Sequence, residues 1–247
     1  MIEFVDIHKS FGPQEVLAGV SISVDRGKVL YVVGSSGAGK SVLVKHLVGL
    51  LRPDSGRILL DGQDLTGLTE RDFYEVRKKC AMVFQNSTLF DSMTVLDNVA
   101  LPYRKHFAMK RAEAYRRALA KLSLVHMEGA AGRSPADLGD GLKKRVAIAR
   151  ALTLEPQYVI FDEPTTGLDP LAAANVDDLI RSLRNDTGVT AIVVSHDLRS
   201  ILTVADRIAM IYQGRIRFDG TPEAFRASRD PVVDQFVNGR PDGPMKI

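Results

Sequence analysis

An eight-residue segment near the start of the chain has the residue types and the spacing of a phosphate-binding loop. It matches the pattern G-x-x-x-x-G-K-[ST]. Small side chains let the backbone wrap a phosphate with its N–H groups pointing inward, and a following helix adds its positive N-terminal end. The lysine can then reach the β- and γ-phosphates of a nucleotide, and the final serine can bind Mg²⁺. The candidate residues are Gly34, Ser35, Ser36, Gly37, Ala38, Gly39, Lys40 and Ser41.

The residues on either side of this segment support that interpretation. Val29–Val33 is a short apolar run of the kind that forms a buried strand, and residues 40–50 form an amphipathic pattern that predicts a helix. Strand, glycine-rich turn and helix in this order are the context in which the pattern binds phosphate. A glycine-rich turn with a chance lysine is the alternative, and the flanking elements argue against it. The motif ends at Ser41, and position 42, where the chain has Val42 rather than a second serine, is assigned no contact with the nucleotide.

Two adjacent carboxylates follow another apolar run, at Asp162 and Glu163. In an open parallel sheet, ligands bind at the carboxyl ends of the strands, so we expect Asp162 to lie near Ser41 and to position Mg²⁺, usually through water. Glu163 is one residue further along and points elsewhere, which suits it to polarise the attacking water. A solvated turn with two acids is the alternative for this pair taken alone.

Composition limits the class of protein. The chain has 247 residues, 45% hydrophobic and 26% charged, with a net charge of +3. These values are typical of a soluble globular protein, and no stripe of Lys and Arg with interleaved aromatics indicates nucleic-acid binding. The single cysteine, Cys80, excludes an internal disulfide and favours a reducing cytoplasm. No apolar run approaches the ~18 residues of a membrane span, and the first residues lack signal-peptide features.

The hydrophobic patterns predict an α/β fold with two kinds of strand. Alternating patterns, with one face buried and one wet, predict an N-terminal antiparallel β subdomain. Nearly continuous apolar runs separated by helices predict a parallel sheet covered on both faces. The alternating segments are 2–7, 20–24 and 57–62; the buried runs are 29–33, 81–84, 158–161 and 191–194; and the intervening helices are expected at about 40–50, 142–154, 171–185 and 197–204.

Residues from about 90 to 140 interrupt this alternation. They predict helices at about 94–104 and 110–124 with no strong strand, so we interpret them as an inserted helical subdomain. The basic stretch Lys110–Lys121 is interpreted as a solvated helix face, with contact to lipid headgroups as the lesser option. Residues 239–247 are predicted to be an irregular tail because of their Pro and Gly content. The whole chain, 1–247, is expected to be one domain.

Taken in order along the chain, these motifs resemble the nucleotide-binding subunit of ABC (ATP-binding cassette) transporters, over essentially the whole length. The resemblance implies ATP and Mg²⁺ as ligands and a P-loop ATPase core with an inserted helical subdomain. Gln85 resembles the Q-loop glutamine, which touches Mg²⁺ and water and whose loop faces the membrane partner. His196 resembles the switch histidine that contacts the γ-phosphate. Lys40, Gln85, Glu163 and His196 are therefore the expected catalytic residues.

Two further contacts with nucleotide or partner subunit are implied by the resemblance. Asp169 ends the segment Thr166-Gly167-Leu168-Asp169, which resembles the D-loop that passes between two subunits. Phe11 occupies the place where the family stacks an aromatic ring on adenine, with Val16 beside it. A core position for Phe11 is the alternative.

The signature motif departs from the family pattern Leu-Ser-Gly-Gly-Gln. Here the residues are Leu138-Gly139-Asp140-Gly141-Leu142. In the family this segment crosses the dimer and holds the γ-phosphate of the other subunit's ATP. Gly139 lacks a hydroxyl, Asp140 adds a negative charge near a phosphate unless its side chain points away, and Gly141 still offers a backbone N–H. We therefore expect a weakened contact across a homodimer, with turnover that is slow or that requires the membrane partner.

Two segments resemble a narrower group, the ATPases of Mla/MCE-type lipid transporters: residues 82–102, and residues 230–239 together with 242–244. That resemblance implies an integral membrane permease, an MCE-domain lipid-binding protein and a small accessory subunit as partners, no nucleic acid, and a peripheral position on the cytoplasmic face of the inner membrane. Three alternatives stay open: a slow ATP-dependent switch, a soluble nucleic-acid-linked ABC protein, and an ABC ATPase for another solute.

Overall fold

The alternating N-terminal segments form a separate antiparallel sheet. In the computed structural model, which describes residues 1–245, its strands pair in the order β2-β1-β4-β5. The predicted strand at 57–62 ends at Leu60, because Asp61 adopts a positive φ of 52° and turns the chain. The strands are β1 (Ile2–Phe11), β2 (Gln14–Val24), β4 (Ser55–Leu60) and β5 (Gln63–Asp64).

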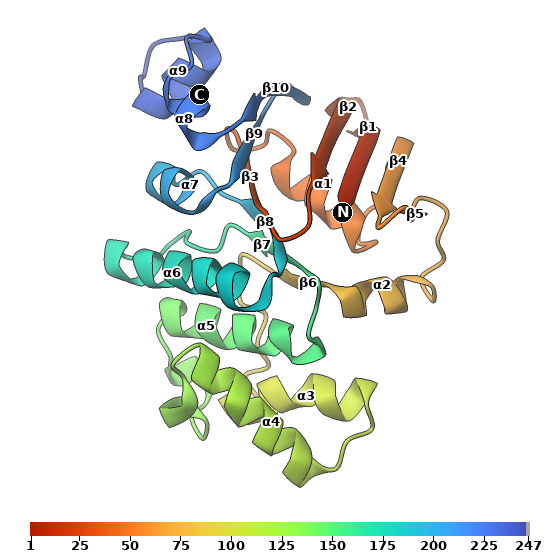
Figure 1. Cartoon of the computed structure of the whole chain (residues 1–247), viewed down its shortest axis with the longest axis vertical. Coiled ribbons are helices and arrows are strands. Elements are labelled where there is room, and N and C mark those ends of the chain that lie inside the picture. The colour runs from red at the N-terminus through yellow and green to blue at the C-terminus, as the bar shows by residue number, and fades with distance from the viewer. Residues whose placement is uncertain (246–247) are drawn as a thin grey trace.

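The buried apolar runs form a six-stranded sheet in the order β10-β9-β3-β8-β7-β6. Pairing is parallel except between β9 and β10. This confirms the predicted α/β fold with a parallel sheet beside an antiparallel subdomain (Figure 1). The strands are β3 (Val29–Val33), β6 (Cys80–Val83), β7 (Tyr158–Asp162), β8 (Thr190–Val194), β9 (Arg207–Tyr212) and β10 (Arg215–Gly220).

Strand β3 shows why these runs are apolar at every position. Tyr31 and Val33 pack into one core with the helices that follow β6 and β7, whereas Leu30 and Val32 pack into a second core with α1 (Lys40–Leu47) and the antiparallel sheet. A strand covered on both faces has no position left for a polar residue. The central sheet therefore separates two cores and carries the loops at its carboxyl edge.

Helices fill the remaining connections. They are α2 (Phe73–Lys79), α3 (Val95–His106), α4 (Arg111–Leu124), α5 (Asp140–Ala151), α6 (Pro170–Thr187), α7 (Leu198–Val204), α8 (Pro222–Arg226) and α9 (Pro231–Asn238), with short 3₁₀ turns at Glu128–Ala130, Pro135–Asp137 and Leu152–Leu154.

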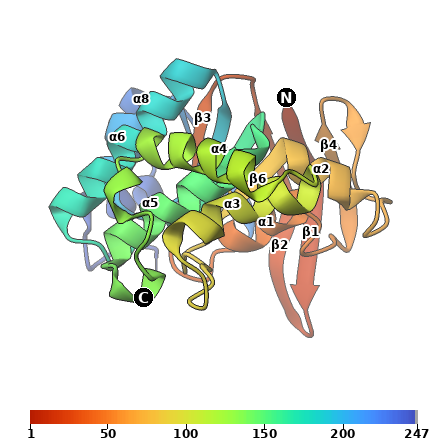
Figure 2. The same cartoon turned by 90° about the horizontal axis from the view of Figure 1, so that it is seen from below.

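The segment between β6 and β7 is helical. Thr94 caps α3 by accepting from the Asp97 N–H at 3.1 Å, and its hydroxyl donates to the Asp97 carboxylate at 2.7 Å. This local exchange fixes the first turn of α3. Figure 2, which looks from below, shows α3 and α4 lying across the lower face of the molecule.

Strands β9 and β10 and the two C-terminal helices were not predicted. The apolar run Ile208–Ile211 is as strong as the run in β6, so a signal was present. This strand lies between β10, which follows it in the sequence, and β3, which is far from it in the sequence. The predicted tail leaves α9 at Gly239 and is held by Gln235, whose side chain accepts from the Met245 N–H at 2.7 Å. Residues 246–247 of that tail lie outside the described residues.

Within residues 1–245, none of the helices combines the length and the apolar character that a membrane span requires.

Candidate functional site

The phosphate-binding loop lies between β3 and α1 and is packed too tightly for larger residues. Gly34 has φ +144°, and a Cβ there would lie 2.4 Å from the carbonyl oxygen of Ile211. Gly39 has φ +99°, and a Cβ there would lie 2.7 Å from Leu17 Cδ2. Both glycines are therefore required by the neighbouring strands β9 and β2 as well as by the turn.

Lys40 is buried within the curve of this loop. Its ammonium donates to the carbonyl oxygens of Gly34 and Ser35, both at 2.9 Å, and lies 3.9 Å from Glu163 Oε1. Burial lowers the Lys40 pKa, while the nearby carboxylates of Glu163 and Asp162 act to raise it. The positive charge of Lys40 thus lies between the loop and the Glu163 carboxylate.

Ser41 and Asp162 are in direct contact, as the sequence predicted. Ser41 Oγ donates to Asp162 Oδ1 at 2.6 Å, and Asp162 is the buried last residue of β7. A hydroxyl and a carboxylate fit Mg²⁺, which prefers oxygen ligands and commonly takes only one or two from the protein. The described residues contain no group of three or more His, Cys, Asp or Glu side chains that could hold a metal alone.

The residue after Ser41 adds no side-chain ligand to this site. Position 42 is Val42, to which the sequence analysis assigns no contact with the nucleotide. The valine is half-buried and packs against the core that α1 shares with the antiparallel sheet. An apolar side chain can neither donate nor accept a hydrogen bond, so only Lys40 and Ser41 offer polar side chains at the start of α1.

Glu163 lies close to two other candidate site residues, Lys40 and His196. Its Oε2 lies 2.8 Å from His196 Nδ1 and accepts from the Thr166 hydroxyl at 2.8 Å. Its backbone has φ 52°, an unusual value for a residue with a Cβ, and its N–H donates to Val194 O at 2.9 Å. The backbone is therefore turned sharply after β7, which aims the Glu163 carboxylate away from Asp162 and toward Lys40 and His196.

Gln85 is held through its backbone by a residue that the sequence analysis missed. The Lys144 ammonium, on α5, donates to the Gln85 carbonyl oxygen and reaches the Glu163 carbonyl oxygen at 3.4 Å. Burial lowers the Lys144 pKa. Lys144 lies three and four residues before Ala147 and Ile148, on the buried face of its helix, and a lysine at such a position was the available signal.

The loop that follows Gln85 is also fixed to α5. Arg150 donates to the Thr88 carbonyl oxygen at 2.9 Å and to its hydroxyl at 3.0 Å. Thr88 itself adopts a positive φ of 49°. The Gln85 loop and the helix after the signature segment are thus one connected unit.

The signature residues lie at the start of α5. Gly139 is its N-cap, and the Asp140 side chain is 79% exposed with a carboxylate oxygen 3.9 Å from Lys143 Nζ. The carboxylate therefore points outward and interacts favourably with the helix dipole. Gly141 packs against α6, since a Cβ there would lie 3.2 Å from Ala172 Cβ. Within residues 1–245 no hydrogen bond or ion pair joins these three residues to the phosphate-binding loop.

Two other predicted contacts are located at the edges of the site. Phe11 ends β1 with 47% exposure and is not a core residue, so the alternative for it is excluded. Val16 lies beside Gly39, because a Cβ added at Gly39 would lie 3.1 Å from Val16 Cγ1. Asp169 caps α6 by accepting from the Leu171 and Ala172 N–H groups at 3.0 and 2.9 Å. Contacts of Phe11 with adenine and of Asp169 with nucleotide stay predictions.

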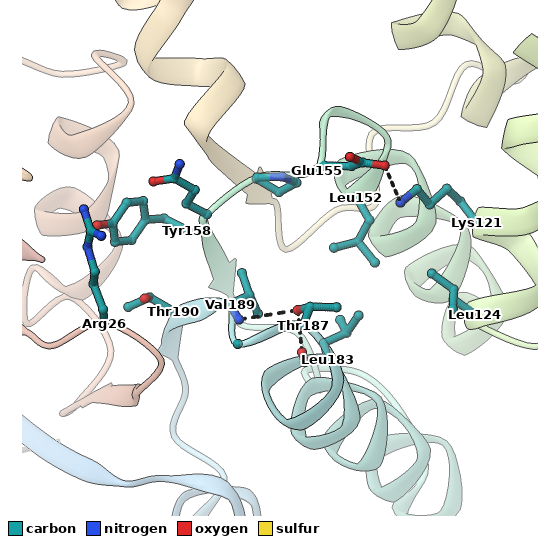
Figure 3. A pocket seen from close by; sticks show the side chains of 13 residues that line it. Arg26, Lys121, Leu124, Leu152, Glu155, Tyr158, Leu183, Thr187, Val189 and Thr190 are labelled. Carbon is teal, nitrogen blue, oxygen red and sulfur yellow. Dashed lines mark hydrogen bonds and ion pairs between the residues drawn. The ribbon is translucent and has the colours of Figure 1, made fainter.

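A separate cavity of about 530 Å³ opens at the opposite end of the parallel strands (Figure 3). It is lined by the first residues of β7 and β8, Tyr158 and Thr190, whereas the site described above uses their last residues. Lys121 and Glu155 on its rim form an ion pair at 3.5 Å. This cavity is therefore not part of the phosphate-binding site.

Comparison with known proteins agrees with this geometry. The profile of the family described as ABC transporter matches residues 17–166. The chain is 38% identical over 247 residues to the intermembrane phospholipid transport system ATP-binding protein MlaF of Haemophilus influenzae, covering 100% of this chain and 94% of that protein. It is also 38% identical over 244 residues to mkl of Mycobacterium leprae, described as a probable ribonucleotide transport ATP-binding protein. That match covers 99% of this chain and 70% of mkl.

Solved structures with the same fold are similar over most of the chain. A dimeric, post-hydrolysis state of the ATP-binding cassette MJ0796 bound to ADP and Pi superposes with a TM-score of 0.83 at 29% identity, covering 90% of this chain and 99% of that one. The cbiO1 subunit of a Clostridium perfringens ABC transporter complex superposes with a TM-score of 0.84 at 28% identity, covering 97% of this chain and 94% of that one.

Proposed function

This chain belongs to the ABC transporter family of ATP-binding proteins, and on that basis we propose that it hydrolyses ATP to drive a membrane permease that moves phospholipid. The observation that carries the lipid assignment is the 38% identity to MlaF over the full length of this chain. A nucleotide site alone would fit any member of the family, because the same fold and site serve many solutes.

The geometry supports a specific role for each residue in hydrolysis. The loop N–H groups and Lys40 bind the β- and γ-phosphates. Ser41 and Asp162 would hold Mg²⁺ and Gln85 would touch it, and the ion would supply positive charge to the phosphates. The Glu163 carboxylate orients a water for in-line attack and accepts its proton. His196, 2.8 Å from that carboxylate, holds it in place and contacts the γ-phosphate.

A second copy of the chain completes the site in this proposal. ABC cassettes of this fold form dimers in nucleotide-bound structures. The signature residues at the start of α5 close on the ATP of the partner subunit, with the Gly141 N–H at the helix N-terminus facing the phosphate. Asp169 and the rest of its loop lie between the subunits, and Phe11 stacks on adenine.

A groove beside the Gln85 loop supports the permease as partner. It has a volume of about 460 Å³ and is lined by apolar residues from β6, the loop after it and α3, including Phe84, Phe90, Leu101 and Pro102. Arg150, which fixes the Gln85 loop, lines the same groove. A permease segment bound there would therefore sense the position of Gln85. An MCE-domain protein and a small accessory subunit complete the proposed complex at the inner membrane.

Ribonucleotide transport is the second candidate, because mkl is also 38% identical to this chain. The match covers 70% of mkl and 94% of MlaF, which favours the lipid assignment. The two candidates share the ATPase chemistry and differ in the permease and the cargo. An affinity pull-down of tagged protein from detergent-solubilised native membranes separates them. We expect a permease, an MCE-domain protein and bound phospholipid. Recovery of a permease without phospholipid would contradict the lipid assignment. Recovery of the tagged protein with nucleic acid alone would contradict both transport candidates.

A further inference from the structure

The last turn of α3 and the loop that leads to α4, residues 104–110, combine positive charge with an exposed aromatic side chain. This segment is called the α3–α4 turn below. Arg104, Lys105 and Lys110 are exposed and form no ion pair within residues 1–245. Phe107, between them, is 54% exposed. Residues 98–112 contain no Asp or Glu. The charge of this turn is therefore not balanced by its own sequence neighbours.

The turn is held in a defined conformation. The Phe107 and Met109 N–H groups both donate to the Tyr103 carbonyl oxygen, at 3.2 and 3.4 Å, and Ala108 takes a positive φ of 48°. Tyr103 is buried, and Met109 packs against the main core. Two residues thus anchor the turn from inside, while Phe107 is left facing outward.

Several basic residues on the neighbouring helices form ion pairs, unlike those of the turn. On α4, Arg116 and Arg117 pair with Glu113 at 2.7 and 2.8 Å. On α2, Lys78 pairs with Glu75 at 2.7 Å. These ion pairs offset part of the positive charge of α4 and α2, whereas Arg104, Lys105 and Lys110 have no such partners within residues 1–245.

The turn also adjoins the groove proposed for the permease. Lys105 and His106 line that groove, and Tyr74 stacks on His106 with ring centroids 5.1 Å apart. Tyr74 and Phe90 are 45% and 50% exposed, so three exposed aromatic side chains border the same region. Figure 1 shows the α3–α4 turn at the lower end of the molecule, opposite α9.

We propose that the α3–α4 turn binds an anionic lipid surface, with Arg104, Lys105 and Lys110 contacting headgroup phosphates and Phe107 inserting at the interface. Exposed aromatic and basic residues together favour a membrane interface, because the ring is buried at the boundary of the acyl chains while the cations are attracted to anionic lipids. The inference rests on the proposed membrane placement and deepens it, but it concerns a contact made by this chain without the permease.

Flotation of the purified full chain with lipid vesicles tests this contact. We expect binding to vesicles of phosphatidylcholine with about one third phosphatidylglycerol, weakened by salt, and no binding to phosphatidylcholine alone. The double variant Arg104→Glu, Lys110→Glu should bind at least about 25-fold more weakly, taking about fivefold for each cation removed. Phe107→Ser should weaken binding without changing the salt dependence.

A matched control is available at the other end of the molecule. Arg226 and Arg229 are exposed and form no ion pair within the described part of the chain. Arg226→Glu, Arg229→Glu makes the same change in net charge and should bind as the wild type does. Equal ATP affinity and melting temperature in all variants establish that they are folded.

Three results would overturn the proposal: no binding to anionic vesicles, equal loss in the control variant, or competition by inorganic phosphate beyond that of chloride at the same ionic strength. If the turn variant loses affinity for a detergent-solubilised permease yet binds vesicles normally, the proposal is also overturned and the turn contacts protein instead. Each of these results leaves the ATPase assignment intact, because none of them measures hydrolysis.

Discussion

His196 and Glu163 face each other from the ends of two neighbouring parallel strands, with Nδ1 2.8 Å from Oε2. Glu163 follows β7 directly, and His196 follows β8 by two residues. Because the carboxyl ends of parallel strands meet at one edge of the sheet, residues 33 positions apart in sequence form one contact. This contact also lies beside Lys40, so the proposed base, its proposed positioning partner and the lysine of the loop occupy one small volume.

Glu163→Gln should retain ATP binding and lower turnover by ~10²–10⁴, the usual contribution of a positioned base. The amide keeps the shape of the side chain but cannot accept the proton of the attacking water. ATP affinity and ATPase rate, measured on the same preparation, check this. Thr166→Val, which removes one hydrogen bond to Glu163, should cost less than about tenfold. Near-normal turnover in Glu163→Gln would contradict the assignment.

Gly34→Ala should abolish nucleotide binding and lower stability. The added Cβ would lie 2.4 Å from the Ile211 carbonyl oxygen, which belongs to a central strand and cannot move aside cheaply. We expect a loss of at least about 2 kcal/mol in the free energy of unfolding, as for other overpacked positions. Gly132→Ala is the control, since a Cβ there meets nothing within 4 Å. Denaturant titration and ATP binding distinguish the two, and a stable, ATP-binding Gly34→Ala variant would refute the packing argument.

Restoring the signature should speed turnover. Gly139→Ser can be made without a clash, because a Cβ at Gly139 meets nothing within 4 Å, and Asp140→Gly removes an exposed carboxylate that would face the partner's ATP. The double variant should hydrolyse ATP about tenfold faster or more, on the scale of one to two charge-assisted hydrogen bonds. The assay is the ATPase rate of isolated protein with sedimentation to detect the dimer. A rate no higher than that of the wild type would show that the departure from the family pattern is neutral.

Lys144→Met should lower turnover with little change in ATP affinity. The methionine fills the same buried space but releases the carbonyl oxygens of Gln85 and Glu163. Removing the buried charge relieves its desolvation, whereas two carbonyl oxygens lose their donor, so the melting temperature should fall by a few degrees. Lys143→Met, at the neighbouring and more exposed position, should have no effect on turnover. Loss of folding in Lys144→Met would show that Lys144 is structural only.

Asp177→Asn should change how stability depends on pH. Burial raises the pKa of the Asp177 carboxyl, and the Ser200 hydroxyl that donates to it only partly opposes this. The folded state therefore binds a proton more readily than the unfolded state, so stability is highest in acid and falls as pH rises from the ordinary pKa through the raised one.

The asparagine variant lacks this titration. It should be more stable than the wild type near neutral pH, by on the order of 1 kcal/mol, and the difference should shrink as pH falls toward about 5. Asp178→Asn, at an exposed position paired with Arg181, should show no such trend. Melting temperatures across this pH range are the measurement, and a pH-independent difference would contradict the assignment.

The phosphate-binding loop and the two kinds of sheet could be predicted from the sequence because each depends on contiguous residues. Gly34 to Ser41 form a loop whose backbone geometry follows from small residues at fixed spacing. The apolar runs that became β3, β6, β7 and β8 need no partner to be recognised, since burial on both faces removes polar residues from the run itself. The order of the motifs then sufficed to identify the family.

Other features depended on the tertiary structure because they join residues far apart in the chain. Lys144 bonds to a carbonyl 59 residues away, and the Ile211 carbonyl sets the space at Gly34 only because β9 pairs with β3. The exposed charge of the α3–α4 turn likewise became evident only once other basic residues were seen to be paired. Sequence determines which groups can do chemistry, whereas distances, burial and competition for partners arise when the strands and helices pack together.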